Sequence, residues 1–177
     1  MDRKELARQQ KQMVDAERAR FLAMNPDVAT WIQIKKTIRN AVLIYCVLHS
    51  VFTVILMLSM EPHGNIAMEV ARLLFQMLWV CVFINPEGNW QLSLILYLWA
   101  LSNFGMLLQY AKDIMDTVAY IFYQPVYGVV VVLEVMAPFL FLAVAVFLTA
   151  FPRNRQLSER ASAFQKQLAE MVKQMAR

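Results

Sequence analysis

Hydrophobic residues along the chain gather into four long runs, which short polar segments separate. Each run meets or approaches the roughly 20 residues that an α-helix needs to cross a bilayer core of about 30 Å. A core helix of a soluble protein normally keeps a polar face, whereas these runs have few polar positions. The pattern therefore predicts four transmembrane helices, over residues 41–60, 66–84, 91–108 and 128–150.

Both ends of the chain differ from this middle part because they are polar. Residues 1–40 and 152–177 hold 22 of the 30 charged residues. Residues 2–24 contain few helix breakers, and the segment from Asn25 to Asp27 suits the end of one helix and the start of the next. We expect an all-α fold: an integral membrane four-helix bundle over residues 41–151, with an amphipathic cytoplasmic helical arm at each end.

The composition and the distribution of charge agree with this class of protein. Hydrophobic residues make up 59% of the chain and charged residues 17%, whereas soluble domains have about 25% charged residues. Of the 17 Lys and Arg residues, nine lie before Ala41 and six lie after Phe151. Lys and Arg gather on the cytoplasmic side of membrane proteins, so both termini are expected there. The same rule explains the net charge of +4 without nucleic acid as a partner.

An even number of runs places the connecting segments on alternate faces of the membrane. Residues 61–65 and 109–125 are then external, and the 85–89 turn is cytoplasmic. The apolar spacing within 109–125 predicts a short amphipathic helix at the outer interface. Cys46 and Cys81 lie near the reducing side, where free, packed thiols are expected rather than a disulfide.

The carboxyl-terminal arm carries an apolar seam with a repeat of about 3.5 residues. The seam consists of Leu157, Ala161, Phe164, Leu168, Met171 and Met175. Such a seam needs a surface to pack against, and we expect it to dock a partner. The candidates are the membrane, another copy, a different cytoplasmic protein, and the amino-terminal arm, which has a weaker stripe of Ala7, Val14, Phe21 and Met24.

Polar residues inside the predicted spans form the candidate site. Arg72 and Glu134 each lie six residues from the external end of their run, and Asn103 lies at nearly the same depth. A charge in hydrocarbon costs at least about 2.5 kcal/mol, so these groups should face inward and meet. We predict an Arg72–Glu134 ion pair, with Asn103 and Gln76 completing its hydrogen bonds.

Three further residues belong to this cluster. Glu69 can pair with Arg72 at i,i+3, and Pro138 leaves the Glu134 carbonyl without its helical partner. His49 lies near the middle of the first run, where a neutral imidazole bonded to a neighbouring helix is expected. The cluster is either structural, joining helices, or a transport or ligand site; a proton relay from His49 toward Glu134 is an alternative for the histidine.

Motifs for an enzyme are absent from the sequence. No phosphate-binding loop, metal-ligand spacing or nucleophile motif occurs, so neither catalytic residues nor a metal or other cofactor is expected. We predict a non-enzymatic subunit or assembly factor of a membrane complex, which docks copies of itself, other membrane subunits or a cytoplasmic protein. The alternative is a small oligomeric channel or ion-coupled transporter that uses the Arg72, Glu134 and Asn103 cluster.

Overall fold

A computed structural model of the chain describes residues 3–59, 66–105, 107 and 125–175. This part is helical apart from short turns and contains no strand, which confirms the all-α class. The helices are α1 (Arg3–Met24), α2 (Pro26–Ser59), α3 (Ile66–Phe83), the 3₁₀ helix η1 (Trp90–Leu94), α5 (Pro125–Thr149) and α6 (Pro152–Met175). Helical residues 95–105 continue directly from η1.

A single residue, Asn25, separates α1 from α2. Its side-chain amide donates a hydrogen bond of 2.9 Å to the Phe21 carbonyl, and α2 begins at Pro26, which suits a first helical position. α2 then continues for 34 residues, a length of about 50 Å. The polar lead-in and the first apolar run therefore form one helix.

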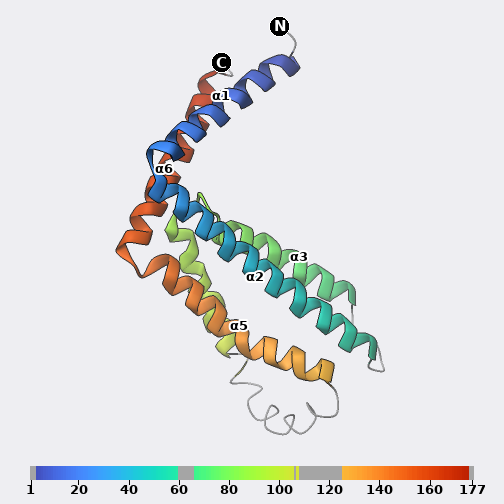
Figure 1. Cartoon of the computed structure of the whole chain (residues 1–177). Coiled ribbons are helices and arrows are strands. Elements are labelled where there is room, and N and C mark those ends of the chain that lie inside the picture. Colours follow the sequence, from blue (N-terminus) through green and yellow to red (C-terminus); the bar gives the residue numbers. More distant parts are fainter. Residues whose placement is uncertain (1–2, 60–65, 106, 108–124, 176–177) are drawn as a thin grey trace.

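In the bundle, α2 packs against both α3 and α5, and η1 packs against α5 and α3 (Figure 1). The interior is aliphatic and aromatic, with Trp99 stacked on Phe141 at a centroid distance of 4.6 Å. Its most buried members are Val42, Cys46, Val80, Ile84, Leu96, Ala100, Ala145 and Leu148. Cys46 and Cys81 are both free thiols, the first buried and the second exposed.

A two-helix arm, made of α1 and α6, projects from one end of the bundle. The two helices lie side by side and antiparallel, with both chain termini at the far end of the arm (Figure 1). Phe21 stacks on Phe164 at 3.8 Å, and the seam residues Leu157, Ala161 and Leu168 are buried. Of the surfaces considered for the seam, the structure places α1 and α2 of the same chain against it.

The turn between α3 and η1 joins the arm to the bundle. Lys35 of α2 is 1% exposed, and its ammonium donates a 3.0 Å hydrogen bond to the Gly88 carbonyl. Glu87, in the same turn, pairs with Arg18 of α1 and accepts a hydrogen bond from Gln165 of α6. One short turn thus contacts α1, α2 and α6, which ties the direction of the arm to the bundle.

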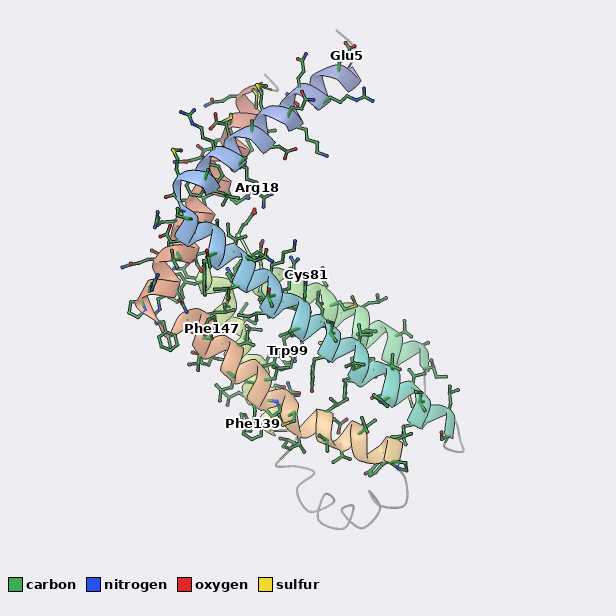
Figure 2. The ribbon with its side chains drawn as sticks, in the orientation of Figure 1. Glu5, Arg18, Cys81, Trp99, Phe139 and Phe147 are labelled. Atoms are coloured by element: carbon green, nitrogen blue, oxygen red, sulfur yellow. The ribbon has the colours of Figure 1, made fainter. Side chains whose placement is uncertain are left out.

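Within the described ranges, three helices are long and apolar enough to cross a membrane: α2, α3 and α5. Their outward surfaces carry large hydrophobic side chains, including Ile44, Leu58, Leu74, Phe75, Leu78, Val132, Met136 and Phe139. Nitrogen and oxygen atoms are instead frequent along the arm, whereas the bundle helices present mostly carbon (Figure 2). The polar side chains therefore gather on the arm and the apolar ones on the bundle, although α2 runs continuously between the two.

The third predicted span differs in its start. Residues 90–94 form a 3₁₀ helix rather than an α-helix, and the Asn89 side chain caps its start by accepting from the Gln91 amide. The end of this run, and the predicted external segments 61–65 and 109–124, lie outside the described residues. α5 begins at Pro125, three residues before the expected start.

Candidate functional site

The candidate site lies in the bundle and is built from α2, α3 and α5. These helices contribute His49, the Glu69–Arg72 pair and Glu134, respectively. The four side chains form a continuous series from α3 across α2 to α5.

Glu69 and Arg72 form a bidentate ion pair along α3. Arg72 Nε lies 2.7 Å from Glu69 Oε2, and Arg72 Nη2 lies 2.6 Å from Glu69 Oε1. The spacing of three residues puts the two side chains on one face of the helix, which is why the sequence already suggested this contact. The Glu69 side chain is 6% exposed, so its charge is balanced where water is excluded.

Arg72 also contacts the imidazole of His49. Its Nη2 lies 3.1 Å from His49 Nδ1. A guanidinium has only donors, so Nδ1 must be the unprotonated acceptor nitrogen in this hydrogen bond. The neutral imidazole then carries its proton on Nε2, on the side away from Arg72.

That second nitrogen faces Glu134. His49 Nε2 lies 3.8 Å from Glu134 Oε1, which is longer than a hydrogen bond, and Nε2 is buried without another partner in the described part of the chain. The predicted direct Arg72–Glu134 pair is therefore wrong. Both residues approach His49 instead, because α2 contacts both α3 and α5 and places His49 between them.

The two amides of the predicted cluster do not complete it. Asn103 donates at 2.8 Å to the Trp99 carbonyl of its own helix, so its amide is used locally. The Gln76 side-chain oxygen is buried and has no hydrogen-bond partner among the described residues. The expectation that both would bond to an Arg72–Glu134 pair is wrong, because that pair is not formed.

Pro138 is buried within α5, four residues after Glu134, so it supplies no amide proton to the Glu134 carbonyl. The neighbouring Leu133 carbonyl accepts a hydrogen bond from the Tyr45 hydroxyl of α2. Tyr45 lies one turn before His49 and was not among the predicted site residues. The i,i+4 relation to His49 was the signal that would have found it.

The two carboxylates of the site differ in how far their side chains are exposed. The Glu134 side chain is 59% exposed, against 6% for Glu69 and 8% for His49. The residues three and four positions away on the same face of α5 are Val130, Val131, Ala137 and Pro138, so Glu134 is a charged group on an apolar face of the helix. Chemically, an acidic oxygen beside an imidazole N–H is a place where a proton can be held or exchanged.

The seam of α6 is used within the chain. In addition to the Phe21–Phe164 stack, the Trp31 indole donates a buried 2.9 Å hydrogen bond to the Ser158 hydroxyl. Arg160 contacts Asp27 at 2.6 Å and the Asn25 side-chain oxygen at 2.5 Å. Met171 and Met175, at the far end of the seam, are half-buried.

Comparisons with protein-family models, with curated proteins and with solved structures find no match to this chain. Among the described residues, no cluster of three or more His, Cys, Asp or Glu side chains has the arrangement of a metal site.

Proposed function

We propose that this protein is a non-enzymatic, multi-pass membrane protein with four spans and cytoplasmic termini, which works as a subunit of a membrane complex. The apolar surfaces of α2, α3 and α5 support membrane insertion. The Lys and Arg residues of the arm support a cytoplasmic position for both termini.

One observation carries the proposal that the protein works in a complex: the exposure of Glu134. This carboxylate lies in the middle of apolar α5, 59% exposed among hydrophobic neighbours. Exposure of a charge to hydrocarbon costs at least about 2.5 kcal/mol, and His49 at 3.8 Å offsets only part of that. Contact with another membrane subunit or a second copy removes the rest of this cost.

The arm is the proposed cytoplasmic docking element, but as a preformed unit. Because the α6 seam packs on α1 and α2, a partner meets the outer surfaces of the paired helices rather than the seam itself. The contacts of Glu87 with both helices hold the arm in a defined direction relative to the bundle. A partner bound to the arm is therefore positioned relative to the membrane.

Photo-crosslinking tests the proposed membrane contact. A photoreactive amino acid replaces Val131, a half-buried residue on the Glu134 face of α5, or the exposed Leu78 on α3 as the control; both positions are apolar. We expect position 131 to crosslink to another protein in native membranes and position 78 to crosslink mainly to lipid. Lipid adducts alone at both positions would contradict the proposal.

A second candidate function, proton-coupled transport, is favoured by the His49–Glu134 contact. The imidazole N–H faces an accessible carboxylate, so a small rearrangement brings the two within hydrogen-bond distance. Proton flux into proteoliposomes tests this role. A transport function requires flux in the wild type and its loss in both His49→Gln and Glu134→Gln.

A further inference from the structure

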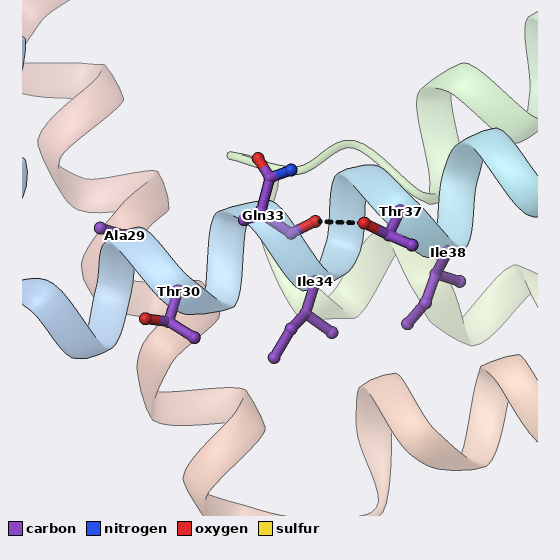
Figure 3. A pocket seen from close by; sticks show the side chains of 6 residues that line it. All are labelled: Ala29, Thr30, Gln33, Ile34, Thr37 and Ile38. Atoms are coloured by element: carbon purple, nitrogen blue, oxygen red, sulfur yellow. Dashed lines mark hydrogen bonds between the residues drawn. The ribbon is translucent and has the colours of Figure 1, made fainter.

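A groove lies where α2, α5 and α6 meet, at the base of the arm. Its volume is about 490 Å³, and its lining comes from Pro26, Asp27, Thr30, Trp31, Ile34, Phe147, Arg153, Asn154 and Leu157. A second hollow of about 510 Å³ continues along α2 to Ile38 and shares Thr30 and Ile34 with the first (Figure 3). The second hollow is an open surface of α2 alone, and it adjoins the groove at these two shared residues.

The lining of the groove and of the adjoining hollow is amphipathic. Ile34 and Phe147 are exposed hydrophobic residues, and Ile38 extends the apolar side toward the bundle. Arg153 and Asp27 add charged side chains to the lining of the groove. An elongated molecule with an apolar part and a charged part matches this division.

The free charge in the groove is positive. Asp27 is paired with Arg160 at 2.6 Å, so its carboxylate is already balanced. The Asn154 amide donates to the Phe147 carbonyl at 2.7 Å, and the Thr30 hydroxyl donates to the Pro26 carbonyl at 2.8 Å. Arg153 is exposed and has no hydrogen bond or ion pair within the described ranges of the chain.

The depth of the groove fits the membrane boundary of the proposed topology. Ile34 precedes the apolar run at Ala41 by seven residues, about 10 Å along the helix, and Phe147 lies near the end of α5. Arg153 follows just beyond that end. A headgroup at Arg153 would therefore have its acyl chain directed toward the hydrocarbon.

We propose that this groove binds one anionic phospholipid of the cytoplasmic leaflet. Its phosphate bonds to the Arg153 guanidinium, whose planar fork matches phosphate oxygens, and an acyl chain lies along Ile34, Ile38 and Phe147. This inference rests on the proposed membrane topology. The exposed apolar walls argue for a lipid over a soluble phosphate, which would leave them uncovered.

Native mass spectrometry of the full-length protein tests this assignment. The protein in mild detergent is mixed with equal amounts of phosphatidylglycerol and phosphatidylcholine that have identical acyl chains. We expect the wild type to retain the anionic lipid about tenfold better, the effect of one charge-assisted contact. Arg153→Gln should reduce this preference to near parity. Lys166→Gln, which removes one exposed charge elsewhere on α6, should keep it.

Two further measurements separate the possible results. Ile34→Glu leaves Arg153 in place but puts a carboxylate into the groove, so it should also abolish the preference. An unchanged preference in Arg153→Gln, or displacement of the lipid by equimolar glycerol phosphate, would overturn the assignment. Extraction of the wild type from membranes by alkaline carbonate would instead show that the proposed topology has failed.

Discussion

The imidazole of His49 faces the carboxylate of Glu134, with 3.8 Å between Nε2 and Oε1. The opposite ring nitrogen lies 3.1 Å from Arg72 Nη2. A single neutral side chain therefore separates a balanced ion pair on α3 from an exposed carboxylate on α5. The two carboxylates therefore differ: Glu69 is buried in an ion pair with Arg72, whereas Glu134 is exposed on the outside of the bundle.

Double-mutant cycles should show that Arg72 is coupled to Glu69 and not to Glu134. Loss of Arg72 alone (Arg72→Met) leaves the buried Glu69 carboxylate unpaired and should lower the free energy of unfolding by about 3 kcal/mol. The Glu69→Gln, Arg72→Met double variant should recover part of this loss, whereas effects of Arg72→Met and Glu134→Gln should add within about 0.5 kcal/mol. Titration with a denaturing detergent measures the free energy of unfolding of each variant. Strong coupling of Arg72 to Glu134 would refute the assigned contacts.

Replacement of His49 should depend on whether the new side chain accepts a hydrogen bond. His49→Leu removes the acceptor of the Arg72 Nη2 bond and should destabilise the bundle by about 1–3 kcal/mol. His49→Gln keeps an acceptor oxygen and should lose clearly less. Thermal unfolding in detergent compares the two variants, and equal losses would mean that the Arg72–His49 contact contributes nothing.

Contacts within one helix could be predicted from the sequence, but neighbours across the bundle could not. A spacing of three residues indicates the Glu69–Arg72 pair, whereas the equal count of residues from the ends of two runs suggested a contact between Arg72 and Glu134 that does not form. Which helix lies between two others depends on packing across the bundle, and no periodicity in a single run contains that information. His49 was therefore assigned to the cluster without Arg72 as its neighbour, and Glu134 was considered only in the alternative of a proton relay.

The sequence also did not determine which surface packs against the α6 seam. The apolar repeat on α6 indicates that this face of the helix must be buried, but any apolar surface could bury it. The choice depends on specific side chains, such as the Trp31 indole that reaches Ser158 and the Phe21 ring that stacks on Phe164. The two residues of each pair are more than a hundred positions apart in the chain. Patterns within a single sequence do not show such distant contacts.

Removal of α6 should release α1 from the arm. A chain truncated after Arg155 loses the Phe164 ring and the Ser158 hydroxyl, which uncovers Phe21 and Trp31. Limited trypsin digestion should then cleave after Arg18 and Arg20 at least tenfold faster than in the full chain, because α1 on its own has few stabilising contacts. A chain shortened only by the last two residues serves as the control. Unchanged protection of α1 would contradict the paired arm.

Cysteine accessibility should give the proposed topology directly. In a background without Cys46 and Cys81, Ala163→Cys on the exposed side of α6 should react with an impermeant maleimide only after the membrane is opened. Asp116→Cys, in the predicted external segment, should react in intact cells. The reverse pattern would show that the positive arms do not face the cytoplasm.

The chemical reactivity of Glu134 tests most directly whether another membrane subunit covers this carboxylate. Native membranes are treated with a hydrophobic or a water-soluble carbodiimide, before and after the complex is dissociated in detergent, and modified carboxylates are located by peptide mass spectrometry. Glu69, held by Arg72, should stay unmodified throughout and serves as the internal control. We predict that Glu134 is protected from both reagents in the membrane and reacts after dissociation. Reaction with the hydrophobic reagent in intact membranes would show a carboxylate facing lipid, and reaction with the water-soluble one would show a water-filled pathway; either result would contradict the account.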